Sequence, residues 1–313
     1  MQCPHDNRSS SPPEGLTGSS FETIRKMIYD YCGIYFEDNK RYLLESRVHQ
    51  RMQVIKTRSY DDYVATLRRE GVTGELGILV EAVTINETYF FRHPAQIELL
   101  EQHLLPELIL RKQASSLPRI RIWSAACSSG DEIFSVAMMI RERLQPQFPR
   151  TTFELIGTDI DAKILTAAQR GSYAAYAVRN VPESLLKKYF TSHGDRWLLD
   201  RSIRDMVRFR KLNLSDRLAM RSMQAFDVIL CANVLIYFDA DAKRRVLDAL
   251  HDSLSPEGYL FIGFSETLYG VTPRFIPVKY DRSLVYRRAD AIANGHPVHP
   301  VLQTLNPILN QAS

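Results

Sequence analysis

Three apolar runs with the composition of buried strands each end in small or polar residues. The run RIRIW is followed by residues 124–130 (SAACSSG), the run FELI by Gly157-Thr158-Asp159, and the run VILCA by Asn233. Because open parallel sheets bind ligands beyond the carboxyl ends of their strands, we expect these three segments to line one site. Small side chains let the backbone approach a ligand, and an acid placed like Asp159 suits the two hydroxyls of a ribose. The pattern indicates a cofactor that contains adenosine.

The first of these segments argues against a dinucleotide. It contains one glycine, Gly130, and lacks the GxGxxG pattern that brings a backbone close to a pyrophosphate. S-adenosylmethionine (SAM) carries no phosphate and needs no such loop, so it fits these residues better than NAD. The histidines form no HExxH pattern and the cysteines no CxxC pair, so we expect no metal and a reducing compartment. The cysteines are Cys3, Cys32, Cys127 and Cys231.

The elements that must position these segments change in kind along the chain. Residues 21–82 have helical periodicity, with apolar side chains recurring at Leu44, Val48, Met52 and Ile55, which predicts one buried face. After Pro118, strand candidates alternate with helix candidates, which is typical of a parallel sheet with helices on both faces. The final runs FIPVKY and SLVYRR predict a hairpin that adds antiparallel strands at one edge.

These changes predict five segments. They are a disordered lead-in at 1–20, a helical domain at 21–82, a linker with an active-site helix at 83–118, an α/β domain at 119–288 with an inserted subdomain at 172–208, and a flexible tail at 289–313. No window of about 18 uncharged apolar residues occurs, so we expect no membrane insertion. The net charge of +4 is too small to indicate nucleic acid.

Six motifs follow one another along the chain. They are TINETYFFR (84–92), WSAACSSGDEIFS (123–135), GTDID (157–161), KLNL (211–214), CANVLIYFD (231–239) and GFSETL (263–268). Their order and spacing, within a match from about residue 21 to residue 288, resemble the CheR family of chemotaxis receptor methyltransferases. The resemblance implies a class I SAM-dependent methyltransferase domain with a Rossmann-like sheet, an N-terminal helical domain and a small β-subdomain insert. It also implies methyl transfer to receptor glutamates, with S-adenosyl-L-homocysteine as the product.

The resemblance further implies roles for individual residues. Cofactor contacts are implied for Asn86, Thr88, Arg92, Glu132, Asp159, Asn213, Leu214, Ala232 and Asn233. Arg92 and Tyr237 match the pair that the family associates with catalysis. Ala232 stands where many relatives have arginine, Asp131 replaces a common glutamate, and Ile85 replaces a common threonine. None of these departures removes a residue that the chemistry requires.

A basic stripe is predicted on the helical domain. On a helical wheel one side carries Lys40, Arg47, Arg51 and Arg58, at spacings of seven, four and seven. The family uses this domain for substrate docking, so we expect the stripe to bind the acidic cytoplasmic helices of methyl-accepting receptors. The alternative is an ordinary solvated basic face.

Members of the family differ in whether the β-subdomain holds a peptide from the C-terminus of the receptor. Members that do so carry a longer, glycine-containing loop, whereas the path from Phe190 to Trp197 is short here and contains one glycine. We therefore expect no pentapeptide tether, and a monomer that works in the cytoplasm. Two alternatives remain, a SAM-dependent methyltransferase for small molecules and a SAM-binding adaptor in a signalling complex. The helical domain and the insert argue against the first, and Arg92 with Tyr237 against the second.

Overall fold

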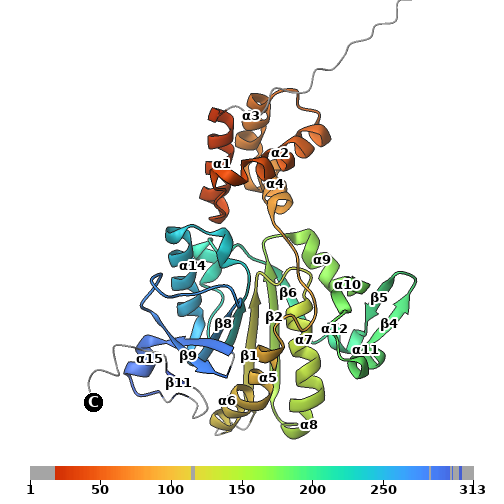
Figure 1. Cartoon of the computed structure of the whole chain (residues 1–313), viewed down its shortest axis with the longest axis vertical. Coiled ribbons are helices and arrows are strands. Elements are labelled where there is room, and N and C mark those ends of the chain that lie inside the picture. The colour runs from red at the N-terminus through yellow and green to blue at the C-terminus, as the bar shows by residue number, and fades with distance from the viewer. Residues whose placement is uncertain (1–17, 114–116, 282, 297, 299–302, 305–313) are drawn as a thin grey trace, which may run out of the picture. The chain divides into compact units, whose positions relative to one another are not determined.

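The computed structural model describes residues 18–113, 117–281, 283–296, 298 and 303–304 (Figure 1). The chain separates into two compact units. The first comprises the residues up to 31 and residues 35–83, and the second comprises residues 32–34 and all those from 84 onwards. Each unit buries apolar side chains of its own.

The first unit is helical throughout its described part. Its helices are α1 (Gly18–Cys32), α2 (Arg41–Ile55), α3 (Tyr60–Glu70) and α4 (Glu75–Val83), with 3-10 turns η1 (Asp38–Lys40) and η2 (Gly71–Thr73). Of the four predicted apolar positions of α2, Leu44, Val48 and Met52 are buried, whereas Ile55 at the end of the helix is only partly buried. This helix ends where Lys56 adopts a left-handed conformation, and Ser59 then caps the start of α3 with its side-chain oxygen.

The second unit is built on an eight-stranded sheet with the order β11-β9-β10-β8-β7-β1-β2-β6. Its parallel strands are β1 (Arg119–Ala125), β2 (Thr152–Asp159), β6 (Val207–Lys211), β7 (Phe226–Cys231) and β8 (Leu254–Ile262). Its antiparallel strands, at one edge, are β9 (Phe275–Tyr280), β10 (Ser283–Arg288) and β11 (Gln303–Thr304). The prediction of a parallel sheet extended by a terminal hairpin is confirmed.

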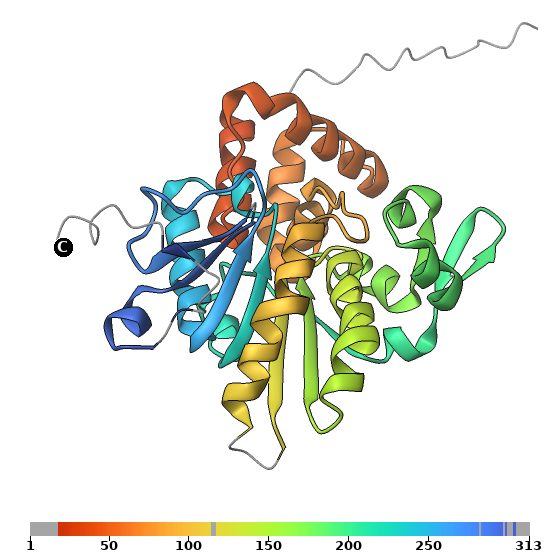
Figure 2. The same ribbon diagram turned by 60° about the horizontal axis from the view of Figure 1, so that its bottom comes forward.

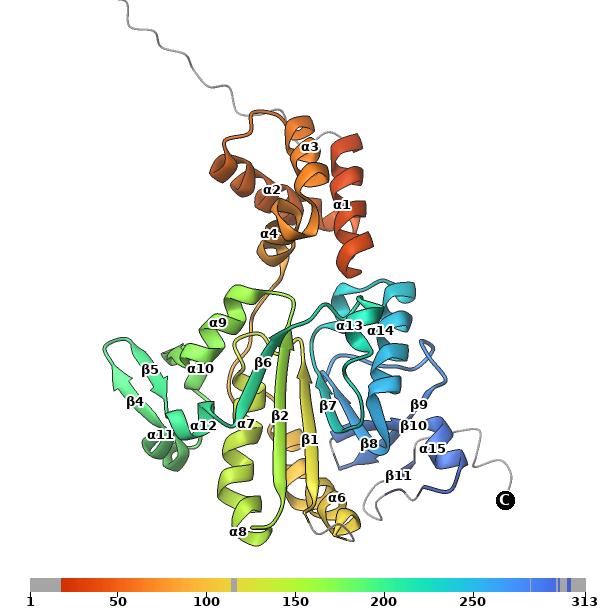
Figure 3. The ribbon, with the colours of Figure 1, turned by 180° about the vertical axis from the view of Figure 1, so that it is seen from behind.

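Helices connect these strands and cover the sheet. Ahead of β1 lie α5 (Pro94–Leu99), the π-helical turn η3 (Leu100–Leu104) and α6 (Leu105–Lys112); after it come α7 (Asp131–Met139), the π-helical turn η4 (Ile140–Leu144) and α8 (Gln145–Gln147). The later helices are α9 (Ala162–Arg170), α13 (Arg217–Met220), the 3-10 turn η5 (Leu235–Tyr237) and α14 (Ala240–Ser253). Figure 2 shows α6 and α7 on one face of the sheet, and Figure 3 shows α14 on the opposite face. Large side chains such as Trp123, Phe134 and Tyr259 fill the core.

The inserted subdomain is smaller than the sequence predicts. It contains β3 (Ser172–Ala174), α10 (Ala175–Val178), α11 (Glu183–Tyr189), β4 (Phe190–His193), β5 (Arg196–Leu199) and α12 (Arg201–Arg204), with the sheet order β3-β5-β4. The expected boundary at residue 208 is wrong, because Val207–Lys211 forms β6 and pairs in parallel with β2 of the main sheet. A short strand candidate does not reveal its pairing partner, so the sequence pattern could not place it.

Both predicted terminal segments also need correction. Residues 18–20 belong to α1 rather than to a disordered lead-in, and Ser20 is buried. At the other end, Ala289–Ala293 forms α15 and Gln303–Thr304 pairs with β9. Residues 1–17 and most of the predicted tail lie outside the described residues. No described helix combines the length and apolar character needed to cross a membrane.

Candidate active site

The loop between β1 and α7 folds tightly against the end of β2. Ala126, Ser128 and Gly130 have positive φ angles of 58°, 50° and 83°. The N–H of Cys127 donates to the carbonyl oxygen of Thr158 at 2.9 Å. Left-handed backbone is crowded by large side chains, so a loop of small residues can adopt it at less cost. The loop therefore presents mainly backbone at the carboxyl edge of the sheet, as a closely bound ligand requires.

Gly157 permits this close approach. A Cβ atom on Gly157 would lie 2.7 Å from the ring of Phe209 and 3.0 Å from Sγ of Cys127. Contacts this short would force the strand and the loop apart, because neither the partly buried ring of Phe209 nor the buried thiol of Cys127 lies at the end of a flexible side chain. The glycine of the GTDID motif thus keeps the first loop seated on β2.

Asp159 ends β2, where the sequence predicts a ribose-binding acid. One of its oxygens accepts a hydrogen bond from the N–H of Ser128 at 2.9 Å, and the other from the N–H of Asp161 at 3.0 Å. Burial raises the pKa of Asp159, and the backbone hydrogen bonds act in the opposite direction. Since a carboxylate has about four acceptor positions, this group can hold the loop and still accept hydrogen bonds from a ribose.

Two carboxyl groups begin α7. Oε2 of Glu132 accepts a hydrogen bond from the hydroxyl of Ser124 at 2.8 Å, and burial raises the pKa of Glu132 to about 7. Burial also raises the pKa of Asp131 to about 6. Oδ2 of Asp131 accepts a hydrogen bond from the hydroxyl of Ser129, whereas its buried Oδ1 has no hydrogen-bond partner among the described residues. Because burial opposes the ionisation of both carboxyl groups, a positively charged neighbour would stabilise their ionised forms.

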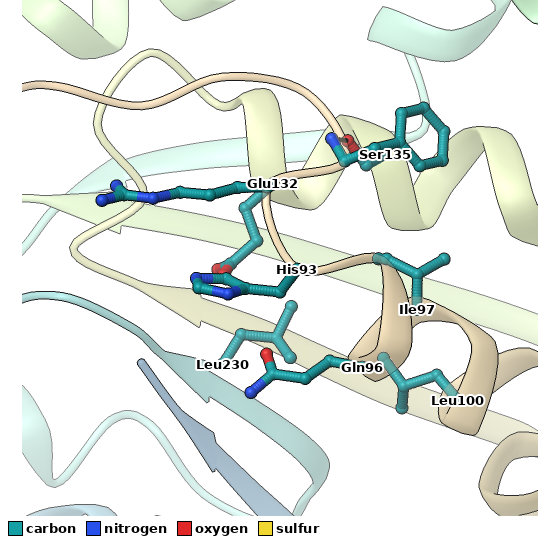
Figure 4. Close-up of a pocket in the computed structure, with 9 residues that line it drawn as sticks. His93, Gln96, Ile97, Leu100, Glu132, Ser135 and Leu230 are labelled. Atoms are coloured by element: carbon teal, nitrogen blue, oxygen red, sulfur yellow. Dashed lines mark hydrogen bonds between the residues drawn. The ribbon is translucent and has the colours of Figure 1, made fainter. Parts of the chain in front are cut away.

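A small cavity lies beside Glu132 (Figure 4). The side chains of Glu132, His93 and Gln96 all line it. His93 and Gln96 come from the start of α5, and the sequence alone did not single them out. Burial lowers the pKa of His93, so its imidazole is neutral at neutral pH. The cavity thus joins the end of the TINETYFFR segment to the first turn of α7.

The TINETYFFR segment lies across the first loop and contacts the insert. Nδ2 of Asn86 donates to Oδ2 of Asp161 at 3.0 Å, and the hydroxyl of Ser128 donates to the carbonyl oxygen of Asn86 at 3.0 Å. Farther along, the ring of Phe90 meets two aromatic rings of the insert edge-on, at centroid distances of 4.7 and 5.2 Å. Thr88 lies between these two anchors and is partly buried. The segment is therefore fixed at both ends over the cofactor side of the sheet.

Arg92 lies near enough to Tyr237 for its positive charge to affect the ionisation of the phenol. The positive charge of Arg92 lowers the pKa of Tyr237, but burial has the larger effect, so this pKa is raised and the hydroxyl stays protonated. Nη1 of Arg92 donates to the carbonyl oxygen of Glu87 at 2.9 Å. Among the described residues, no carboxylate lies within ion-pair distance of Arg92. The predicted catalytic pair thus offers one unpaired guanidinium and one neutral hydroxyl.

The ends of β7 and β8 are tied together by a carboxylate that the sequence analysis did not single out. Oε2 of Glu266 accepts hydrogen bonds from the N–H groups of Asn233 at 2.8 Å and Gly263 at 2.7 Å. Asn233 has a positive φ of 61°, and its Oδ1 lies 3.2 Å from Nε2 of His93. The acid in the GFSETL motif was the available signal, but only the fold shows which backbone groups it holds.

The remaining predicted cofactor residues follow the carboxyl ends of β6 and β7. Asn213 and Leu214 follow β6, and the N–H of Leu212 donates to the carbonyl oxygen of Asp159 at 2.9 Å. This places the KLNL motif beside the predicted ribose acid. Ala232 is partly buried and directly follows β7, where it has only a methyl group to offer.

A larger cavity of about 540 Å³ opens on the β7 and β8 side of the site. Its lining includes Arg92, His93, Asn233, Gly263 and Glu266. The first loop and Asp159, which lie over β1 and β2, do not contribute to its wall. The strand ends therefore offer two adjoining regions, one suited to an adenosine and one that is open to a second reactant.

The family is decided by comparison with known proteins. Residues 19–84 match the family model "CheR methyltransferase, all-alpha domain", and residues 86–284 match "CheR methyltransferase, SAM binding domain". The chain belongs to the CheR methyltransferase family. It is 37% identical over 273 residues to "Chemotaxis protein methyltransferase 2" of Vibrio cholerae, covering 87% of this chain and 93% of that one. It is 38% identical over 278 residues to "Chemotaxis protein methyltransferase 1" of Pseudomonas aeruginosa, covering 86% and 97%.

This CheR chain therefore has the predicted class: a SAM-dependent methyltransferase with an N-terminal helical domain. The residues present suit the cofactor, because the first loop exposes backbone and Asp159 retains free acceptor positions. At the first turn of α7, a bound cation would favour the ionised forms of Glu132 and Asp131, whose pKa values are raised by burial. Within the described residues, no three His, Cys, Asp or Glu side chains converge as metal ligands would.

SAM affinity should depend on pH through Glu132. The pKa of Glu132 is about 7 in the free protein, and a bound cation favours the ionised carboxylate. Binding should then release a proton below pH 7, so affinity should rise with pH, by up to about tenfold per unit, and level off above pH 7. Calorimetric titrations at pH 6 to 8, in buffers of different ionisation enthalpy, measure both effects. The Glu132→Gln variant serves as the control and should lose the dependence; a flat profile in the unaltered protein would contradict the role.

The predicted basic stripe on the first unit is not one continuous surface. Only Arg47 and Arg51 lie on α2, because Lys40 precedes the helix and Arg58 follows the left-handed residue that ends it. Arg51 makes two hydrogen bonds to the buried carboxylate of Glu75, at 2.9 and 2.7 Å. Arg51 is thus part of the core of this unit, and three exposed basic residues remain for docking.

Removal of Arg51 should destabilise the helical unit. Arg51→Ala would leave the carboxylate of Glu75, which is 2% exposed, with a hydrogen bond from Tyr63 but no cation. Breaking one side of a buried ion pair costs about 3 kcal/mol or more. Urea denaturation of the full chain, followed by circular dichroism, should show this loss. Arg47→Ala, at an exposed position of the same helix, should stay within about 0.5 kcal/mol of the unaltered protein; equal midpoints for both variants would refute the expectation.

Proposed function

We propose that this chain transfers the methyl group of SAM to glutamate side chains of methyl-accepting chemotaxis receptors and forms glutamate methyl esters. The observation that carries the proposal is that Arg92, which has no carboxylate partner among the described residues, lines a cavity of about 540 Å³ beside the predicted cofactor residues. Membership of the CheR family and the names of the relatives support the choice of substrate. The enzyme would act as a monomer in the cytoplasm, on the signalling helices of its receptor.

The chemistry needs no general base. SAM supplies a methyl group already activated by a sulfonium, and a glutamate carboxylate with a pKa of about 4.3 is ionised at neutral pH. One carboxylate oxygen forms a bond to the methyl carbon as the carbon–sulfur bond breaks, and no proton moves. The protein must therefore orient the carboxylate and remove its water.

Arg92 and His93 line the cavity, and together with Tyr237 they are suited to that task. Arg92 has no carboxylate partner among the described residues, so its N–H groups can bind the acceptor carboxylate or the carboxylate of SAM. Tyr237 keeps its proton and can donate one hydrogen bond. His93 is neutral and bonded to Asn233, so it adds no charge that would hold the acceptor too tightly.

Tritiated SAM with receptor cytoplasmic fragments tests the proposal. Base-labile label on the receptor supports it. Label on a small molecule from an extract would indicate a small-molecule methyltransferase, and no label a SAM-binding adaptor. We also propose that no C-terminal receptor peptide is needed, because β4 and β5 are joined by the short turn of Gly194 and Asp195. Receptor fragments with and without that peptide should then react at equal rates.

Docking through the first unit is a separate proposal with its own test. Arg47 and Arg58 are exposed and carry the same charge, so an acidic receptor helix should be attracted to them. The double variant Arg47→Glu with Arg58→Glu should raise the KM for the receptor at low salt and leave SAM affinity unchanged. The intact Arg51–Glu75 pair keeps the unit folded in this variant. Unaltered receptor kinetics would exclude these residues from docking.

A further inference from the structure

An arginine of the insert is held between two tyrosine rings. Cζ of Arg179 lies 3.5 Å from the ring centroid of Tyr89 and 3.5 Å from that of Tyr176. The two rings meet at 70°, with their centroids 6.3 Å apart. Nη1 of Arg179 also donates to the carbonyl oxygen of Tyr176 at 2.5 Å. The guanidinium is therefore fixed before any partner arrives, which reduces the entropy lost on binding.

This guanidinium is exposed and lacks a counter-charge. Among the described residues, no carboxylate pairs with Arg179, although Arg51, Arg121 and Arg274 all pair with acids. A guanidinium has five N–H donors, and the hydrogen bond to Tyr176 uses one of them. Tyr176 is 58% exposed, so the stack lies at the surface.

The stack continues into the active site. Tyr89 lines the cavity of about 540 Å³, and Cζ of Arg92 lies 5.5 Å from the same ring. Arg92 and Arg179 are both anchored to backbone carbonyl oxygens and not to acids. Positive charge thus extends from the cavity wall, along Tyr89, to the surface of the insert.

A purely structural role does not account for the stack. The insert is already attached to the TINETYFFR segment by Phe90, whose ring packs on Tyr173 and Phe190 and whose N–H donates to the carbonyl oxygen of Ala177 at 3.0 Å. The three rings are buried, and these contacts would hold the two segments together without Arg179.

We propose that Tyr89, Tyr176 and Arg179 form a subsite that binds an acidic side chain of the receptor helix, next to the glutamate being methylated. The inference rests on the proposed function and names a determinant of its substrate specificity. On a helix, side chains three or four residues apart lie about 5–6 Å from one another, so an acid one turn from the acceptor stays close to it. The planar fork of a fixed guanidinium suits a carboxylate through two parallel hydrogen bonds.

Receptor kinetics with Arg179→Ala test the subsite. The KM for a receptor cytoplasmic fragment should rise by roughly tenfold to a hundredfold, the range for a lost charge-assisted hydrogen bond to a carboxylate. Arg179→Lys should recover only part of the loss, since an ammonium cannot make the two parallel hydrogen bonds. Arg201→Ala removes another exposed arginine of the insert, one already paired with Asp205 at 3.1 Å, and should match the unaltered protein.

A double-mutant cycle identifies the partner. Acids that flank the methylated glutamate are changed one at a time to glutamine in the receptor fragment. One change should raise the KM of the unaltered enzyme and have no further effect on Arg179→Ala. The proposal is overturned if Arg179→Ala keeps its KM, if no acid is coupled to it, or if SAM affinity falls as far as receptor affinity. Absence of receptor methylation by the unaltered enzyme would instead refute the proposed function itself.

Discussion

Replacement of Asp159 by alanine should weaken SAM binding by about a hundredfold or more. The side chain is predicted to accept hydrogen bonds from the ribose, and each charge-assisted hydrogen bond is worth about 1.5–3 kcal/mol. It also accepts hydrogen bonds from the N–H groups of Ser128 and Asp161, so its loss would release the first loop from the end of β2. Both effects act in the same direction, and calorimetric titration with SAM measures their sum.

Asp159→Asn is the matched control for the loop. It keeps the size of the side chain and one acceptor oxygen, so the affinity should fall between those of the alanine variant and the unaltered protein. Circular dichroism must show that each variant is folded. A folded Asp159→Ala chain with unchanged affinity would remove Asp159 from the cofactor site.

Arg92→Ala should slow methyl transfer by about 100- to 1000-fold, the usual loss when one preorganised donor is removed from a reacting centre. Tyr237→Phe should give a smaller loss, because it removes one neutral hydroxyl and leaves the ring in place. SAM affinity should change less than the rate in both variants, since both side chains are assigned to the reacting end. Single-turnover kinetics beside SAM titration separate the two quantities.

The matched variant is Arg92→Lys, which keeps the charge and loses the planar fork. A rate near that of the alanine variant would mean that geometry matters more than charge at this position. If either alanine or phenylalanine variant loses SAM affinity in full proportion to its rate, that residue anchors the cofactor and does not act on the acceptor.

Several features of this protein follow from its sequence because they depend on local patterns. Apolar spacing predicts the buried face of α2, and the alternation of strand and helix predicts the parallel sheet. The polar strand ends predict Asp159 and Asn233 at one edge, since parallel strands place their carboxyl ends together. The six motifs predict the family, which the comparisons confirm.

Other features were decided only by contacts between distant parts of the chain. Val207–Lys211 belongs to the main sheet because it pairs with β2, and Arg51 is unavailable for docking because it pairs with the buried carboxylate of Glu75. The anchoring role of Glu266 and the stack around Arg179 likewise join residues from separate segments. Periodicity reports which face of an element is buried, but a side chain's partners depend on how the elements pack. The sequence therefore determined which residues could do the chemistry, and the tertiary structure decided which of them are free to do it.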